Sequence, residues 1–356
     1  MAKIAILGDN HQGVKNDNVV FHDYFSKCFS WFFDYIDANN IKEIIHLGDV
    51  YDRRKYINFL SAHRIRKDFF EQIVSRGIKA HIITGNHDVF WKNSHVVNSL
   101  EEIIGDRYPG INVYSEPQAI TIDGLSIQLV PWICESNAIQ SYDTIKNTSC
   151  QILVGHFELQ GFELLKGVIA EHGDDPALFS KFDLVFSGHY HHKSSKGNIH
   201  YLGAFAEYTW ADFNDPRGIT IFDTDTRKFE FIQNPHTIFK MISYDDDKYP
   251  NIMDLIRDKD YSDFKDCYVR IVCVNRKNQL AFDYLLEKLY KVSPADISVI
   301  EKEAMTITDT KENQIVDQAQ DTSTILDTYI KSLVLPVDND RLKEFMKEIY
   351  EEAMSL

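Results

Sequence analysis

Short apolar runs recur through the first 205 residues of this 356-residue chain, and each is followed by a glycine. The runs are four or five residues long and rich in isoleucine, valine and leucine, which is typical of strands buried on both faces. The predicted strands are Lys3 to Leu7, Glu43 to Leu47, His81 to Thr84, Gln151 to Val154 and Leu184 to Ser187.

Amphipathic stretches with helical spacing separate the first of these strands. Val19 to Ala38 places phenylalanines at positions 25, 29, 32 and 33, and Ser61 to Arg76 has a similar apolar face. We interpret both faces as core packing. The alternation of strand, loop and helix predicts a layered α/β core.

The character of the chain changes near residue 240. Before that point a strand pair, Ile219 to Asp223 and Lys228 to Gln233, is expected to complete the core. After it, a small α+β domain is predicted. Its elements are a strand from Tyr268 to Val274, a helix from Leu280 to Tyr290 and a strand from Ile297 to Ile300.

The last part of the chain is polar and then amphipathic. Residues 302–321 are weakly periodic and predict a linker. Two helices are expected after it, Thr324 to Leu333 and Asp340 to Met354. The predicted segments are therefore a main domain at 1–238, a small domain at 239–301, a linker at 302–321 and a helical segment at 322–356.

Composition narrows the class of protein. No run of about 18 apolar residues or signal peptide is visible, so we expect no membrane segment. Five cysteines, an odd number without a C-x-x-C pair, favour a reducing compartment. A net charge of −16 argues against general affinity for nucleic acid, although a local basic groove or a metal site would still allow it.

The residue after each of the five glycines is Asp, Asn or His. Because ligands of α/β sheets bind at the carboxyl ends of the strands, we expect these residues to converge. Carboxylate and amide oxygens together with neutral imidazoles suit manganese, iron or zinc, and a pair of such ions hydrolyses phosphoesters. The clusters are D-x-H at 9–11, G-D-x-x-D at 48–52, G-N-H-D at 85–88, G-H at 155–156 and G-H-x-H at 188–191.

This ordered series resembles the motifs of the calcineurin-like metallophosphoesterases over about the first 235 residues. Within them the chain is similar to the SbcD type of DNA double-strand-break repair nuclease subunit, and more so to the recombination endonuclease subunits of T-even phages. Residues 124–135 and 214–218 carry that closer similarity. The resemblance implies a β-sandwich flanked by helices, a capping domain that binds DNA and a helical tail.

The resemblance also implies roles for the motif residues. Two divalent ions, manganese by expectation with magnesium as the alternative, would share Asp49 as a bridge. The ligands of one ion would be Asp9, His11, Asp49 and His191, and those of the other Asp49, Asn86, His156 and His189. His87 would stabilise or protonate the leaving oxygen and would be oriented by Asp88, whereas Asp52 would lie just outside the ligands.

Three readings of the function compete. The first is a DNA exonuclease and endonuclease that acts with an SbcC-type coiled-coil ATPase, as a homodimer, in a recombination and repair complex. The second is a metallophosphatase or phosphodiesterase acting on a phosphoprotein or small nucleotide. The third is a non-catalytic scaffold, which the full set of ligand types disfavours. The second is disfavoured because phosphoprotein phosphatases carry G-D-x-V-D-R-G and G-N-H-E, and because about 115 further residues follow the core.

Two further surfaces are predicted for the first reading. Arg53, Arg54 and Lys55 follow the second motif and either contact DNA phosphates or form a solvated loop. The helical tail is expected to dock on the ATPase or, alternatively, to pack on its own core. Its apolar contact residues would be Leu326, Ile330, Leu333, Leu342, Phe345 and Ile349. The T-even similarity suggests a phage protein in a bacterial cytoplasm.

Overall fold

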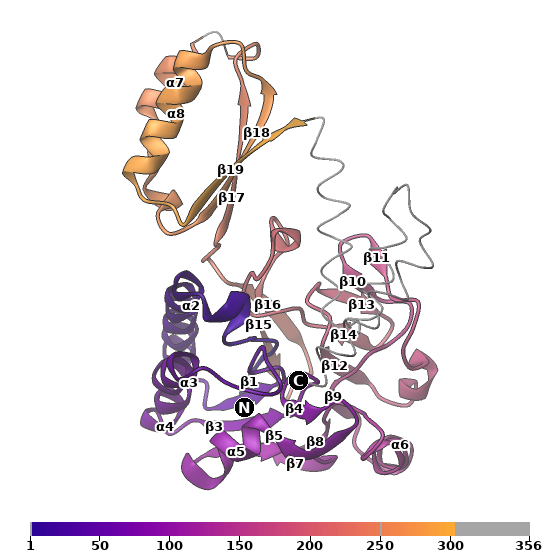
Figure 1. Cartoon of the computed structure of the whole chain (residues 1–356). Coiled ribbons are helices and arrows are strands. Elements are labelled where there is room, and N and C mark those ends of the chain that lie inside the picture. Colours follow the sequence, from indigo (N-terminus) through magenta and orange to yellow (C-terminus); the bar gives the residue numbers. More distant parts are fainter. Residues whose placement is uncertain (1, 250, 303–356) are drawn as a thin grey trace, which may run out of the picture. The chain divides into compact units, whose positions relative to one another are not determined.

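The computed structural model of the chain describes residues 2–249 and 251–302 (Figure 1). These residues form two compact units. The large unit contains the residues up to 208 together with 212–238, and the small unit contains 209–211 together with the described residues from 239 onward. The linker and tail predicted beyond residue 302, with the six tail residues expected to contact a partner, lie outside the described residues.

The first sheet of the large unit contains three of the five predicted strands. Its order is β16-β15-β1-β2-β3-β6, with β1, β2, β3 and β6 parallel and the other two antiparallel. The strands are β1 (Lys3–Leu7), β2 (Glu43–His46), β3 (Lys79–Ile83), β6 (Ile111–Tyr114), β15 (Gly218–Asp223) and β16 (Phe229–Gln233).

The second sheet contains the other two predicted strands. Its order is β13-β14-β12-β9-β8-β7, with β8, β9, β12 and β14 parallel. The strands are β7 (Gln118–Ile122), β8 (Leu125–Val130), β9 (Ile152–His156), β12 (Leu184–Gly188), β13 (Ser194–Lys196) and β14 (Ile199–Tyr201). The predicted strand ends therefore converge from two sheets rather than from one.

A hydrophobic core fills the space between the two sheets. Ile4 and Ile45 from the first sheet and Leu129, Ile152 and Phe186 from the second belong to one buried cluster, and each is at most 1% exposed. Strands with both faces covered read as continuous apolar runs, which is why the sequence pattern identified them. The α/β fold with a β-sandwich is thereby confirmed.

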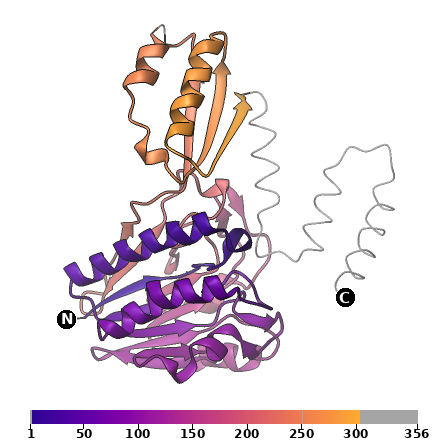
Figure 2. The same ribbon diagram turned by 60° about the vertical axis from the view of Figure 1, so that its left-hand side comes forward.

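Helices cover the outer face of the first sheet (Figure 2). The prediction for Val19–Ala38 is confirmed to the residue as α2, and Asn18 caps it by accepting a hydrogen bond from the Val20 amide at 2.8 Å. The second predicted helix is present but contains a π-helical turn, so it divides into three parts. The helices of this unit are α1 (Val14–Asp17), α2, α3 (Phe59–Ile65), η1 (Arg66–Phe70), α4 (Glu71–Ser75), α5 (Ser99–Ile103), η2 (Gly105–Arg107), α6 (Ala138–Asn147) and η3 (Pro176–Phe179).

The aromatic face of α2 packs as the sequence predicts. The Phe29 ring centroid lies 5.1 Å from those of both Phe69 and Phe205, and all three side chains are buried. This contact joins α2 to η1 and to the loop after β14, so the aromatic stripe has a structural role. Two hairpins complete the unit, β4 (Val89–Trp91) with β5 (Ser94–Asn98) and β10 (Glu163–Leu165) with β11 (Val168–Ile169).

The small unit is a three-stranded parallel sheet with two helices. Its order is β17-β18-β19, and α7 and α8 contribute to its buried core. The sequence predicted three of these elements and missed β17 and α7. The elements are β17 (Phe239–Asp245), α7 (Ile252–Asp258), η5 (Ser262–Phe264), β18 (Tyr268–Asn275), α8 (Gln279–Lys291) and β19 (Asp296–Glu301), with η4 (Trp210–Asp212) at the junction in the chain.

No helix within residues 2–249 and 251–302 combines the length and hydropathy that a bilayer span requires.

Candidate metal centre

The predicted ligands lie on sharp turns at the strand ends. Asp9, His11, Asp49 and His189 have φ angles of 53°, 45°, 53° and 85°, in the left-handed region that non-glycine residues rarely adopt. The turns after β1 and β2 are tied together, because the Asp9 amide donates to the Gly48 carbonyl and the His11 amide to the Asp49 carbonyl, each at 3.0 Å. Such backbone strain is typical of functional sites.

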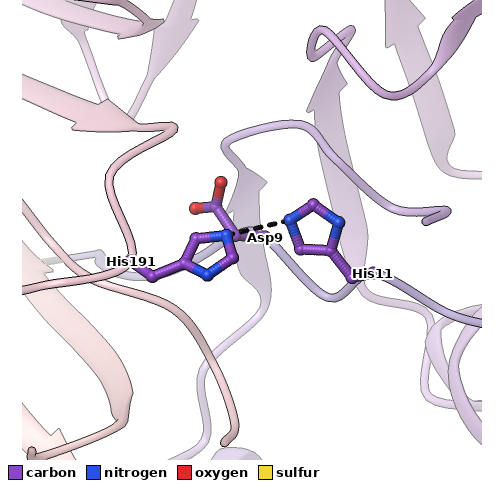
Figure 3. A group of neighbouring side chains, drawn as sticks. All are labelled: Asp9, His11 and His191. Carbon is purple, nitrogen blue, oxygen red and sulfur yellow. Dashed lines mark hydrogen bonds between the residues drawn. The ribbon is translucent and has the colours of Figure 1, made fainter. Parts of the chain in front are cut away.

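One group of ligand atoms is formed by Asp9, His11 and His191 (Figure 3). The atoms that could bind a metal ion, one from each side chain, lie within 4.8 Å of one another, and the Nε2 atoms of His11 and His191 are 3.0 Å apart. Asp9 Oδ1 accepts a hydrogen bond from the His189 amide at 2.9 Å, whereas Asp9 Oδ2 is buried without a hydrogen-bond partner. A buried oxygen of this kind needs a cation or donor.

A second group is formed by Asp49, His156 and His189, with Asn86 beside them. His156 Nε2 lies 3.4 Å from Asp49 Oδ2. The Asn86 Oδ1 atom lies 2.9 Å from His156 Nε2 and 3.0 Å from His189 Nδ1. The other ring nitrogen of His189 is buried without a partner.

Asp49 stands between the two groups. Its Oδ2 atom is 3.6 Å from His11 Nε2 in the first group and 3.4 Å from His156 Nε2 in the second. Its Oδ1 atom accepts a hydrogen bond from the His87 amide at 2.8 Å, which fixes the carboxylate plane. Asp49 Oδ2 therefore lies near imidazole nitrogens of both groups.

Burial controls the charge state of the centre. It lowers the pKa of His191 to about 3 and those of His11 and His189 well below their usual value, so these imidazoles are neutral near pH 7. Burial also raises the pKa of Asp9 to about 7. Neutral imidazoles and carboxylates are the form in which these side chains bind divalent metal ions.

Asp49 and His156 form an opposing pair. Burial alone would raise the pKa of Asp49, but the His156 and His87 imidazoles hold it well below the ordinary value. Burial alone would lower the pKa of His156, but the Asp49 carboxylate raises it to about 9. The buried Asp49 carboxylate is thus stabilised by positive charge beside it. Asp9 Oδ2 and His189 Nε2 are buried without hydrogen-bond partners, and this set of oxygen and nitrogen atoms fits divalent metal ions.

The prediction that Asp88 orients the His87 ring is wrong. The Asp88 carboxylate instead accepts hydrogen bonds from backbone amides of two loops. The donors are the amides of Asp49 at 2.8 Å, Val50 at 3.0 Å and Gly85 at 2.9 Å. Those amides are closer at hand than the His87 ring, because Asp88 ends a turn that folds back against the β2 loop. Asp88 therefore holds the loop that carries Asp49.

Asp52 is the residue that orients His87. The His87 Nδ1 atom lies 2.6 Å from the Asp52 main-chain carbonyl oxygen. A carbonyl only accepts, so Nδ1 donates and Nε2 is the nitrogen that exchanges protons. The Asp52 carboxylate lies 3.7 Å from His11 Nδ1, and Asp52, His11 and His87 form a third group of neighbouring side chains that could hold a metal ion.

The basic loop after the second motif has mixed surroundings. The Arg53 guanidinium donates to Asp17 at 2.8 Å, and Arg54 Nε donates to the Asn86 carbonyl at 2.7 Å. Lys55 is exposed. Arg54 thus supports the turn of a candidate ligand, and the predicted DNA contacts of this loop remain a proposal.

An ion network behind His191 is absent from the sequence prediction. Arg217 donates to the His191 carbonyl at 2.6 Å and pairs with Asp212 at 2.5 Å and Asp215 at 2.8 Å. His192, left without a role by the sequence, lies 2.8 Å from Asp215. The sequence signal for this network is the motif at 214–218, which contains both Asp215 and Arg217.

Replacing Arg217 by methionine should lower the free energy of unfolding by about 3–5 kcal/mol, because two buried carboxylates lose their counter-ion. Urea denaturation measures the change. The matched variant Arg227→Met removes an exposed ion pair with Asp183 and should cost less than about 1 kcal/mol. Equal small losses in both variants would contradict a stabilising role for the network.

Known proteins resemble this chain along all or part of its length. Residues 2–193 match the model of the calcineurin-like phosphoesterase family. Exonuclease subunit 1 of Enterobacteria phage T4 is 33% identical over 99% of both chains. The SbcD component of the nuclease SbcCD from Staphylococcus saprophyticus is 22% identical over 54% of this chain and 59% of its own. The solved structure of an archaeal phosphodiesterase is 15% identical, covers 65% of this chain and 99% of its own, and has a TM-score of 0.34.

Proposed function

Because the chain belongs to the calcineurin-like phosphoesterase family, we propose that it is a two-metal nuclease that hydrolyses the phosphodiester bonds of DNA. The observation that carries the proposal is the position of Asp49 Oδ2 between two groups of convergent donors. The names of the two relatives, both nuclease subunits, support DNA as the substrate.

We propose the division of ligands that the family pattern implies. Asp9, His11 and His191 would hold one ion, and Asn86, His156 and His189 the other, with Asp49 shared. Divalent ions bound there lower the pKa of water and neutralise phosphate charge. We propose manganese, which accepts mixed oxygen and imidazole ligands.

His87 would act on the leaving oxygen. As the bond from phosphorus to the attacking water oxygen forms, the bond to the leaving sugar oxygen breaks. His87 would enter this step as the imidazolium and give its Nε2 proton to the leaving oxygen, and the proton released by the attacking water would return to Nε2. The Asp52 carbonyl supports this role by holding Nδ1–H at 2.6 Å. Asp88 acts indirectly, by fixing the loop that carries Asp49.

The experiment that tests this function uses metal-stripped protein and an end-labelled DNA duplex. We expect manganese to restore cleavage and the His189→Ala variant to remain inactive. If a simple phosphodiester is hydrolysed through the same histidine while DNA is not cut, the metal centre is right and the substrate is a phosphoprotein or small nucleotide. If manganese restores neither reaction, the catalytic proposal fails.

We propose that the protein works with an SbcC-type ATPase, since both nuclease relatives are subunits. Deletion of residues 322–356 should abolish co-purification with the ATPase while leaving hydrolysis of a simple phosphodiester unchanged. The measurement is a pull-down with full-length protein as the control. Retained co-purification would contradict docking through the tail.

A homodimer is also proposed, through the helices near the second and third motifs. Phe59, the first residue of α3, is 94% exposed, and Tyr56 just before it is 62% exposed, which supports a surface that a second copy could cover. We also propose that the protein acts in recombination and repair within the cytoplasm of an infected bacterium, and the phage source of the relative supports the bacterial setting.

A further inference from the structure

A cavity of about 150 Å³ lies beside the candidate metal ligand His156. It is lined by three aromatic residues, Trp132, Tyr142 and Phe157, and by two acidic residues, Glu158 and Asp174. None of these five has a part in the proposed metal chemistry. Metal binding therefore does not explain why the cavity has aromatic walls and two acidic residues at its edge.

The cavity adjoins the position proposed for the second ion. The Trp132 ring centroid lies 5.2 Å from that of His189 and 6.1 Å from that of His156, and both histidines are proposed ligands of that ion. In a nucleotide only one sugar separates the phosphate from the base. A phosphate held at the ions would thus bring its own base to the cavity.

The size and walls of the cavity fit one flat ring. An apolar cavity of about 150 Å³ in another protein binds benzene, so this volume accommodates the six-membered ring that every nucleobase contains. Aromatic side chains are the usual platforms for unpaired bases, because every base offers a π-face. Trp132 and Tyr142 are partly exposed, so their rings are accessible to a ligand.

The acidic edge selects the chemistry of the occupant. The Tyr142 hydroxyl donates to Asp174 Oδ1 at 2.8 Å, and burial together with this bond raises the pKa of Tyr142 to about 12. The carboxylate has further lone pairs for an N–H donor. The carboxylate repels a phosphate but can accept a hydrogen bond from an exocyclic amino group. Adenine, cytosine and guanine have such a group, and thymine does not.

We propose that this cavity binds one unpaired nucleobase of the substrate, on a nucleotide adjoining the phosphodiester that is cleaved. Trp132 stacks on the base and Asp174 accepts a hydrogen bond from its amino group. The inference rests on the DNA nuclease function proposed above. It implies that the enzyme acts on frayed ends or extruded nucleotides, whose bases are already unpaired or become so on binding.

Dinucleotides with a single phosphodiester test the inference. The substrates are d(ApA) and two analogues in which a tetrahydrofuran abasic residue replaces the nucleoside on the 5′ or the 3′ side. The full-length protein with manganese should cleave one of the two analogues with a kcat/KM about 5–150-fold below that of d(ApA). Trp132→Ala should cleave d(ApA) and that analogue equally.

Two further variants separate stacking from misfolding and from the polar contact. Trp132→Phe keeps an aromatic ring and should restore part of the preference for d(ApA). Asp174→Ala removes the acceptor oxygen and should lose the discrimination against thymine placed on the sensitive side. The control is Ile139→Ala, an 82% exposed residue on α6, the helix that carries Tyr142, and it should behave as the unaltered protein.

The outcomes distinguish this inference from the function on which it rests. If the protein cleaves d(ApA) and both abasic analogues equally, or if Trp132→Ala keeps the preference, the base pocket is wrong and the nuclease stands. If methyl p-nitrophenyl phosphate is hydrolysed while neither d(ApA) nor longer single strands are cut, the nuclease proposal itself fails.

Discussion

Replacing His87 by alanine should lower the rate of DNA hydrolysis by about 10²–10⁴-fold and leave manganese binding unchanged. The imidazole donates from Nδ1 to the Asp52 carbonyl at 2.6 Å, which leaves Nε2 for proton transfer. His87 also lies with His11 and Asp52 in a third group of possible ligand atoms, so the metal content of this variant separates the two roles. Single-turnover cleavage of an end-labelled duplex measures the rate, and metal analysis of the dialysed protein measures binding.

The matched control for that variant is His200→Ala. His200 lies on β14, where its ring contacts Phe186 and Phe229 and its Nδ1 atom contacts Ser195, and it belongs to neither ligand group. It should cleave DNA at the unaltered rate. A His87→Ala protein that loses its manganese would show that His87 is a ligand rather than a proton donor.

Replacing Asp49 by asparagine should remove metal binding and lower hydrolysis by roughly 10³-fold or more. Two ions within one site need a shared negative ligand, and their loss forfeits several kcal/mol of charge stabilisation in the transition state. Asparagine keeps the volume and an oxygen that can accept the His87 amide, so the change isolates the charge. Isothermal titration with manganese measures affinity and stoichiometry.

The control for Asp49→Asn is Asp106→Asn, which makes the same chemical change at an exposed residue of η2. It should bind manganese with unaltered affinity. If Asp49→Asn still binds two ions with the original affinity, Asp49 does not bridge them. Loss of one ion with retention of the other would instead place Asp49 in a single ligand group.

Much of the fold was predictable because its strands are buried on both faces. The runs around Ile4 and Ile152 read as strands without any pairing information, and the capped, periodic α2 was predicted to the residue. Their division between two sheets was not predictable. Sheet membership depends on partners far along the chain, such as the pairing of Ala5 with Ile221.

The β17 strand was missed for a related reason. Its burial pattern from Phe239 to Asp245 has neither the continuous run of a fully covered strand nor a clean alternation. Its neighbour β18 is buried from Val269 to Cys273 and was predicted. The order of apolar and polar residues in β17, FKMISYD, follows no regular pattern, whereas the other edge strand, β19, was predicted from its apolar residues between Ile297 and Ile300.

The candidate ligands could be predicted because they are the residues directly after buried strands. The role of Asp88 could not, since whether a carboxylate faces a neighbouring ring or a neighbouring backbone depends on how the turn folds. The Arg217 network was missed because it connects β15 to the His191 loop through space. Supporting residues of this kind carry no spacing pattern of their own.

The left-handed turns at Asp9, Asp49 and His189 have a consequence for how the protein can change over time. Glycine at any of these positions would relieve backbone strain of about 1 kcal/mol or more, while deleting a proposed ligand. Backbone geometry alone would therefore favour a residue that carries no ligand atom. Aspartate and histidine are therefore kept on such turns by selection for activity. In a lineage that no longer needs the activity, we expect these positions to be among the first to change.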